Sequence, residues 1–222
     1  MLHAVITGDI IDSSKLNDQE RRKMLDTLEK VFKKIEGKTR KFDFKIYRGD
    51  SYQGICEKPE LALLTVLKIK AALLSTELDN KRQKLDARMA IGIGTAEKRA
   101  ETLGQSDGEA FRNSGQLLNP KTREEFKQLK EYSLLFRSPW EEVNQEMDVL
   151  FSALDGLISK WTIEQAEVVY ELLNNKTQTL IATQLKKSVG AISERVQNSN
   201  WLAIRNILTR YENVIKNKVK NG

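Results

Sequence analysis

Apolar and polar residues alternate with two different periods along this chain, and those periods predict its strands and helices. An apolar run at residues 2–7 predicts a buried strand. Residues 42–47 alternate strictly between apolar and polar, and residues 52–56 form another strand-like run, so the intervening turn signal Gly49-Asp50 predicts a hairpin. A fourth strand is expected at residues 88–93.

Helical periodicity fills the segments between these strands. A stripe of apolar residues predicts a first helix that is capped by Asn17 or Asp18 and ended by Gly37. Pro59 suits the first turn of a second helix, whose apolar stripe continues to Leu78. Beyond the fourth strand, the pattern predicts helices at 108–118, at 119–130 and from Pro139 onward, with an edge strand at 132–136.

The predicted order β-α-β-β-α-β is that of the ferredoxin-like, or split βαβ, arrangement. In this topology the first strand lies antiparallel beside the third, so Asp9 at the end of the first strand should lie beside Asp50 in the hairpin. Two neighbouring carboxylates repel unless a cation separates them. Mg²⁺ or Mn²⁺ would serve, with the Ile10 carbonyl as a further ligand. The alternative is that Asp9 caps the following loop and Asp50 only shapes a turn.

The last third of the chain shows helical periodicity alone. Thr162 is expected to cap one helix, a second begins near Gln178, and Ser188 is expected to cap a third. A final helix at 201–218 would pack its apolar stripe against this module or against a second subunit in a homodimer.

Charge is distributed unevenly between these two parts. Residues 1–159 contain 27 Lys and Arg against 26 Asp and Glu, whereas residues 160–222 contain 10 against 5, so the second part carries most of the net charge of +6. A basic terminal module favours a polyanionic partner. The single Cys56 and single His3 exclude an intramolecular disulfide and a thiolate or imidazole metal cluster. No apolar run reaches the roughly 20 residues of a membrane helix, and no signal peptide is evident, so a cytoplasmic protein without a membrane partner is expected.

Four motifs occur in order along residues 1–137: GDIxxS from Gly8, RGDSxxG from Arg48, RxxIGIG from Arg88 and DGEAFR from Asp107. Together they resemble the SatD family and, more distantly, the catalytic palm of nucleotidyl and diguanylate cyclases. The resemblance implies that Asp9 and Asp50 bind divalent ions that hold a nucleoside triphosphate. It also suggests a set of nucleotide contacts: Ser13, Ser14, Lys15, Gly49 and Arg112.

The chain departs from the cyclases where they stabilise the transition state. The asparagine and arginine that cyclases carry there fall near Arg112 and Gln116. The charged residue expected at the second of these positions is absent, and Arg112 or Asn113 would have to substitute for it. We therefore expect metal and phosphate binding, and not cyclase activity. Asp107 and Gly108 have the alternative role of capping the helix that follows.

Residues 177–196, TQTLIATQLKKSVGAISERV, resemble a helix-turn-helix, and the segment before them resembles LuxR-type and sigma-factor region-four modules. In that family the third helix enters the major groove of double-stranded DNA. The resemblance implies phosphate contacts from Lys186, Lys187 and Ser188, and an outward face that includes the base-reading candidates Arg195 and Gln197. The remaining members of that face are Gly190, Ala191, Ser193, Glu194 and Asn198. Lys186 replaces the usual turn glycine and Lys187 a usual hydrophobic residue, and a trihelical protein-interaction domain is the alternative.

These observations predict an α+β protein in three parts: a cyclase-like ferredoxin-like palm at 1–138, a connecting helix at 139–159 and an all-α helix-turn-helix domain at 160–222. The leading hypothesis is a DNA-binding regulator that senses a nucleotide or a metal. An active metal-dependent nucleotidyl cyclase or nucleotidyltransferase with a targeting module is the alternative. A third hypothesis is a scaffold whose palm binds nothing.

Overall fold

A computed structural model of the chain describes residues 1–39, 42–47, 49–78, 84–96 and 108–221. The predicted contribution of Asp107 lies outside these residues. The strands are β1 (Leu2–Ile10), β2 (Phe42–Tyr47), β3 (Ser51–Cys56), β4 (Ala87–Thr95) and β5 (Leu134–Arg137). The helices are α1 (Asp18–Thr39), α2 (Ala62–Leu74), α3 (Glu109–Leu118), α4 (Arg123–Glu131), α5 (Glu141–Ile158), α6 (Ile163–Leu173), α7 (Gln178–Leu185), α8 (Val189–Asn198) and α9 (Trp201–Asn221), with short 3₁₀ turns η1 (Ser13–Lys15) and η2 (Pro59–Leu61).

The strands form one mixed sheet with the order β2-β3-β1-β4-β5. β1 lies between β3 and β4 and runs antiparallel to both, as the sequence predicts for β1 and β3, and β5 adds a parallel strand at the β4 edge. The register places Asp9 opposite Ser51 on β3 and opposite Arg88 on β4. The predicted neighbourhood of the two motifs therefore follows from the strand pairing.

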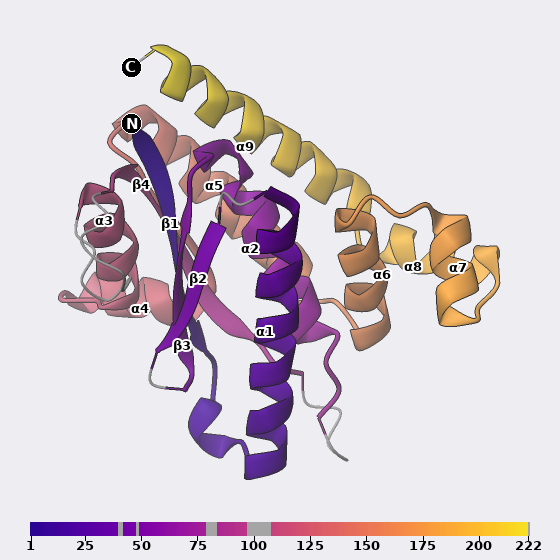
Figure 1. Ribbon diagram of the computed structural model, residues 1–222. Coiled ribbons are helices and arrows are strands. Elements are labelled where there is room, and N and C mark those ends of the chain that lie inside the picture. The colour runs from indigo at the N-terminus through magenta and orange to yellow at the C-terminus, as the bar shows by residue number, and fades with distance from the viewer. Residues whose placement is uncertain (40–41, 48, 79–83, 97–107, 222) are drawn as a thin grey trace.

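Helices cover both faces of this sheet (Figure 1). Alternate residues of β1 point to opposite faces: Ala4 and Ile6 join the main core with α1 and α2, whereas Val5 packs with Ala110 and Phe111 of α3. The Thr7 hydroxyl donates to the Ser114 hydroxyl of α3 at 2.9 Å. Asp9, two residues further along β1, therefore lies on the α3 face.

The C-terminal helices pack into the same core as the sheet. Trp161 is buried, and the buried residues of α9, with Ala166, Val169 and Leu173 of α6, belong to the main cluster that also holds β1 and α2. The Tyr211 hydroxyl of α9 donates to the Pro59 carbonyl at 3.1 Å, and α9 runs along one end of the molecule (Figure 1). The predicted division into 1–138, 139–159 and 160–222 stays a prediction, but the buried core crosses both of its boundaries.

Several element boundaries differ from the sequence prediction for local reasons. The first helix continues through Gly37 to Thr39. The second helix ends at Leu74 because the hydroxyls of Ser75 and Thr76 both bond to the Ala72 carbonyl within its last turn. The fourth helix begins at Arg123, because Thr122 and Glu125 exchange side-chain to backbone hydrogen bonds in a capping box.

Across the part of the chain that the structure describes, none of the helices combines the length and the apolar character that crossing a bilayer requires.

Candidate functional site

Asp9 and Asp50 meet around a single hydroxyl at one edge of the sheet. The Ser51 Oγ lies 3.2 Å from Asp9 Oδ1 and 3.4 Å from Asp50 Oδ1. One hydroxyl carries one proton, so it donates to only one of the two carboxylates at a time. The Asp9 and Asp50 carboxylates therefore lie close together, each with one oxygen near the same hydroxyl.

The turn after β1 is tied directly to the hairpin. The Ser13 hydroxyl donates to Asp50 Oδ2 at 2.7 Å, and the Ile10 amide donates to the Asp50 carbonyl at 3.0 Å. Asp12 adopts the left-handed conformation with φ of 57°, which turns the chain into η1, and Gly49 supplies a φ of 79° at the hairpin tip. Asp12 is thus a turn residue, and Ser13 contacts Asp50 of the aspartate pair.

Arg21 is a member of this site that the sequence reasoning missed. Its Nη2 donates to the Ser13 carbonyl at 3.2 Å, and its Nη1 lies 4.0 Å from the position that a Cβ on Gly49 would occupy. Asn17 caps α1 by accepting from the Glu20 amide at 2.9 Å, which fixes the helix start one turn before Arg21. That capping signal was visible in the sequence, but the packing of the first turn of α1 against the hairpin was not.

The electrostatics of Asp9 are unfavourable for a bare carboxylate. Burial raises the pKa of Asp9 above its ordinary value, and the neighbouring charge of Asp50 raises it further. The Ser51 hydrogen bond and the positive charge of Arg88 oppose this shift. A cation between the two carboxylates would compensate their mutual repulsion and stabilise the ionised form of Asp9.

The donor set fits a hard cation that shares its coordination sphere with a ligand. Among the described residues, no group of three or more His, Cys, Asp and Glu side chains could hold a metal ion. The edge instead offers two carboxylates and the Ser51 hydroxyl, with Ile10 at the end of β1 beside them. Mg²⁺ is typically held by one or two carboxylates, with phosphate oxygens and waters completing its octahedron.

The other predicted nucleotide contacts, Ser14, Lys15 and Arg112, are exposed side chains. Ser14 is exposed, and Lys15 forms an ion pair with Asp12 at 3.0 Å. Arg112 is exposed on α3. The Asn113 amide donates to the Ile93 carbonyl at 2.8 Å, so this side chain fastens α3 to β4.

The predicted DNA-binding segment is a pair of short helices joined by a tight turn. Lys186 adopts the left-handed conformation that glycine usually supplies, and Ser188 accepts from the Ala191 amide at 3.1 Å, so it caps α8 as predicted. Ile181, Ala182 and Ile192 form a small buried cluster with Val168 of α6. Val189, the first residue of α8, is 48% exposed.

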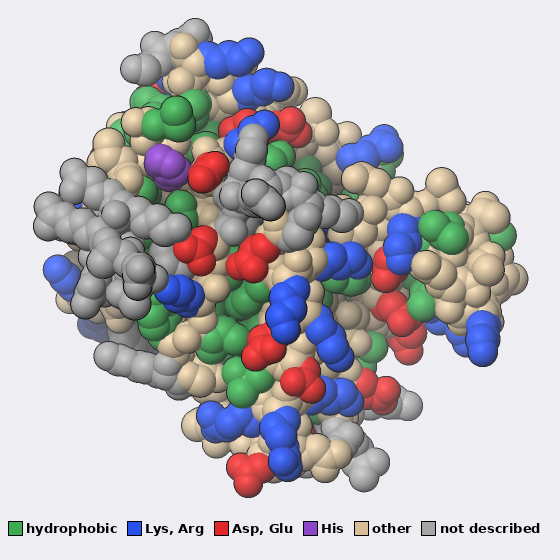
Figure 2. All heavy atoms as spheres, in the orientation of Figure 1, with side chains coloured by type: hydrophobic (Ala, Val, Ile, Leu, Met, Phe, Trp, Pro, Cys, Tyr) green, Lys and Arg blue, Asp and Glu red, His purple; other side chains and the backbone are tan. Residues whose placement is uncertain are grey.

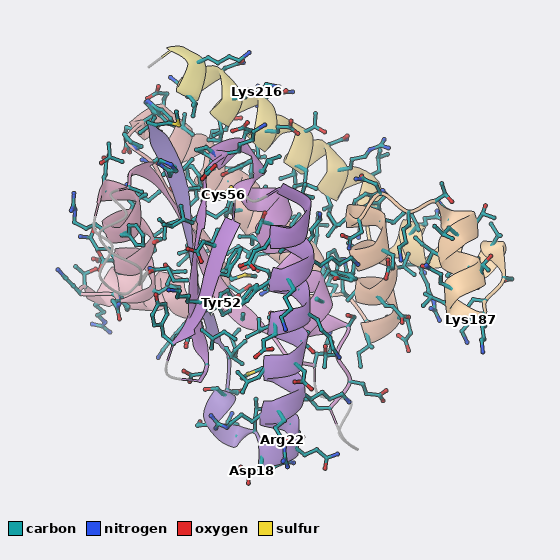
Figure 3. All side chains as sticks on the ribbon, viewed as in Figure 1. Asp18, Arg22, Tyr52, Cys56, Lys187 and Lys216 are labelled. Atoms are coloured by element: carbon teal, nitrogen blue, oxygen red, sulfur yellow. The ribbon has the colours of Figure 1, made fainter. Side chains whose placement is uncertain are left out.

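The polar residues of α8 face solvent. Lys186, Lys187 and Ser188 are exposed, and the Lys187 label marks the outer end of the α6–α8 group (Figure 3). Along α8, Ala191 and Arg195 are half-buried, and the remaining predicted contacts are exposed: Gly190, Ser193, Glu194, Gln197 and Asn198.

The basic charge of the last third does not gather on this surface. Arg210 forms a bidentate pair with Glu146, at 2.6 and 3.1 Å, and Lys218 pairs with Glu142, so both neutralise α5. Burial raises the pKa of half-buried Glu167 above its ordinary value, and the nearby positive charge of Arg195 partly opposes this shift. On the face shown in Figure 2, acidic and basic side chains are also interspersed along α1.

Comparison with known proteins gives a family and a remote structural likeness. The sequence profile of the SatD family matches residues 3–211. No protein of curated function matches the chain. Among solved structures, the catalytic core of a rhodopsin-guanylyl cyclase with converted specificity, in complex with ATPαS, matches at 17% identity and a TM-score of 0.36. That match covers 50% of this chain and 68% of the cyclase chain.

Proposed function

The chain belongs to the SatD family, and we propose that its sheet edge at Asp9 and Asp50 binds a nucleotide polyphosphate together with Mg²⁺ or Mn²⁺. The observation that carries this proposal is the Ser51 hydroxyl, which lies within 3.2 to 3.4 Å of one oxygen of each carboxylate. Two acidic groups that surround one hydroxyl create a local demand for positive charge. A divalent ion meets that demand with the ligand type it prefers.

The described residues offer few protein ligands at this edge, which supports a metal that binds together with phosphates. Two carboxylates leave most of an octahedral sphere to other oxygens, and a nucleotide polyphosphate supplies them. Arg21 borders the pair on the α1 side and is a donor suited to phosphate oxygens, whereas the Ser13 hydroxyl already donates to Asp50. Arg88 borders it on the β4 side. These residues would bind and orient the polyphosphate around the metal.

The proposal is one of ligand sensing on a cyclase-like, ferredoxin-like palm. In phosphoryl transfer, positioned cationic groups stabilise the charge of the transition state. Asn113 is engaged by the Ile93 carbonyl and Gln116 carries no charge, which leaves Arg112 as the cationic residue that α3 offers for that role. Nucleotidyl cyclase or nucleotidyltransferase activity is the alternative function, and product formation on incubation with each nucleoside triphosphate and Mn²⁺ would establish it.

Calorimetric titration with Mn²⁺ and each nucleoside triphosphate tests the binding site. We expect Asp9→Asn and Asp50→Asn each to weaken metal-dependent nucleotide binding by at least about 30-fold, roughly 2 kcal/mol. Asp12→Asn is the matched control, because Asp12 is an exposed neighbour paired with Lys15, and its affinity should stay within about threefold of wild type. Equal affinities for all four proteins would refute the proposal.

A second candidate function is sequence-dependent binding of double-stranded DNA by α7 and α8. The specific observation in its favour is the exposed polar face of α8, which Ser188 caps and Lys186 and Lys187 precede. Together with the first proposal, it describes a regulator whose DNA affinity depends on the bound nucleotide. A trihelical protein-interaction module remains the competing interpretation of the same helices.

Fluorescence anisotropy of the full chain on duplex DNA, measured across a salt series, separates these two interpretations. DNA binding predicts a linear fall of log affinity with log salt, and Lys187→Ala should reduce the slope by about 1. Lys216→Ala, which removes an exposed lysine on distant α9, should leave the slope unchanged. An affinity without salt dependence would instead favour the protein-interaction role.

A further inference from the structure

A recess of about 280 Å³ lies beside Asp9 at the other half of the same sheet edge. Its walls come from the end of β1, the start of β4, the end of α4, the start of β5 and the inner side of α5. The lining residues that matter here are Ile11, Asp86, Arg88, Ser133, Asp155 and Gly156. None of them belongs to the predicted metal or DNA-binding sets.

The back wall of the recess is a fixed polar network. Lys70, only 1% exposed, places its ammonium 2.6 Å from Asp86 Oδ1, 2.9 Å from the Ala87 carbonyl and 2.5 Å from Ser133 Oγ. Ser133 in turn donates its hydroxyl and its amide to the buried carboxylate of Asp155. A network in which every member is hydrogen-bonded is rigid, which is a requirement for a preformed binding wall.

Asp86 keeps an acceptor available to a ligand. The two hydrogen bonds that its carboxylate accepts within the described chain, from Lys70 and from the Ala87 amide, both fall on Oδ1. About one third of the side chain remains exposed. A carboxylate held in this way is suited to accept hydrogen bonds from sugar hydroxyls, as acidic residues do in dinucleotide-binding folds.

Arg88 connects the recess to the aspartate pair. It lines the recess, and it stands opposite Asp9 in the β1–β4 register, close enough for its charge to act on the Asp9 carboxyl. β4 and β5 begin about 5 and 10 Å from β1, given the spacing of neighbouring strands. A nucleoside triphosphate is long enough to span that separation.

We propose that this recess binds the nucleoside portion of the nucleotide whose phosphates and metal are held at Asp9 and Asp50. The inference rests on the proposed function and adds the direction in which the ligand lies, from the hairpin across Arg88 to α5. At about 280 Å³ the recess falls just below the usual size range of small-molecule pockets, so it suits a nucleoside and not a whole nucleoside triphosphate. Tyr132 is an aromatic residue among those that line it.

Gly156 provides a way to fill the recess without disturbing the core. It lines the recess from α5, and a Cβ built on it meets no atom within 4 Å. Gly115 on α3 is equally open and does not line the recess, so it is a matched control. Both positions are helical glycines, and substitution of either one removes the same conformational cost.

The binding experiment compares each of the four ribonucleoside triphosphates with inorganic tripolyphosphate, in the presence of Mn²⁺, by calorimetry. Wild-type protein should bind one nucleoside triphosphate at least about tenfold more tightly than tripolyphosphate. Gly156→Trp should abolish that preference and leave tripolyphosphate affinity within about twofold, whereas Gly115→Trp should keep it. Equal affinities in wild type, or a preference that survives Gly156→Trp, would overturn the inference while the metal–phosphate site stands. Absence of binding for both ligands would refute the proposed function as well.

A smaller substitution guards against misfolding of the tryptophan variant. The wild-type chain has one cysteine, Cys56, which is buried and whose thiol pKa is raised by burial, so it reacts slowly with maleimides. The thiol introduced by Gly156→Cys should be labelled at least about fivefold more slowly with the preferred nucleoside triphosphate and Mn²⁺ than with tripolyphosphate and Mn²⁺. The thiol from Gly115→Cys should be labelled at equal rates. Equal rates at position 156 would contradict the proposal.

Discussion

The ammonium of Lys70 lies 2.6 Å from the carboxylate of Asp86, and the lysine is almost completely shielded from water. The pair connects α2 to the start of β4, one strand away from Asp9. A charge taken out of water is costly unless a partner compensates it. The stability of this edge of the sheet should therefore depend on the lysine far more than on any exposed ion pair.

Substitution Lys70→Ala should destabilise the fold by about 3 kcal/mol, because it leaves Asp86 and Ser133 without their cation. Lys33→Ala is the comparison, since Lys33 and Glu29 form an exposed pair 3.6 Å apart on α1. That change should cost less than about 1 kcal/mol. Urea denaturation of both variants measures the difference, and equal losses would show that the buried pair contributes no more than a surface one.

Close packing of α3 on β4 should make Gly92 intolerant of any side chain. A Cβ at this position would lie 2.3 Å from the Ala110 carbonyl oxygen and 2.4 Å from the Ser114 amide nitrogen. Gly92→Ala should therefore push α3 off the sheet and cost about 1–3 kcal/mol. Gly115→Ala, on the open side of the same helix, should instead stabilise the protein by about 0.5–1 kcal/mol. Thermal unfolding followed by circular dichroism checks both signs, and a neutral Gly92→Ala would exclude this packing.

The pH dependence of stability should reveal that the folded protein disfavours the charged form of Asp9. Because the pKa of Asp9 is raised in the folded protein, the native state retains a proton that the unfolded state has released. Stability contributed by this group is thus present at low pH and lost as pH rises from about 3.9, the unfolded value, through the folded pKa. The Asp9→Asn variant has no carboxyl to ionise at this position, so it should not lose this stability. The free energy of unfolding of the variant relative to wild type should therefore increase between the unfolded and the folded pKa of Asp9, and stay constant at higher pH. A gain that is constant from pH 3 to 7, measured by urea denaturation, would contradict the assignment.

Removal of residues 160–222 should prevent the remainder from folding. Trp161, Ile204 and Tyr211 are buried in the core that also contains the sheet, and Tyr211 packs edge-on against Phe136 with ring centroids 5.9 Å apart. A chain ending at residue 159 would expose these apolar contacts. We expect it to bind a hydrophobic dye and to lack a cooperative thermal transition. A cooperative transition would instead support an independent N-terminal domain, as the sequence suggested.

Element types were predictable where a local signal existed. Alternation identified β2, and the caps Asn17, Thr162 and Ser188 marked helix starts where the structure has them. Predicted boundaries were wrong where a capping signal was overlooked, or where a glycine was too weak a stop signal within a strongly helical segment. The Thr122–Glu125 box was missed, and Gly37 was assigned a helix end although the helix continues to Thr39.

The candidate site was predictable only in part, for a related reason. Asp9 and Asp50 follow from strand order, because an antiparallel β1–β3 pair necessarily brings the end of one strand beside the start of the other. Arg21 could not be found in this way, since its place depends on the angle at which α1 leaves the turn. Charge counting was misleading for the last third, because Arg210 and Lys218 are neutralised by α5 residues distant in sequence.

The sequence by itself determined the element order, the strand alternation and the two aspartates, because these depend on periodicity and on short-range hydrogen bonding. Tertiary structure alone decided that Arg21 joins the aspartate pair, that α6 and α9 share the core of the sheet, and that Lys70, Asp86 and Ser133 form one network beside a recess. Contacts of this kind join residues far apart along the chain. Their geometry depends on how whole helices pack, and no local pattern encodes it.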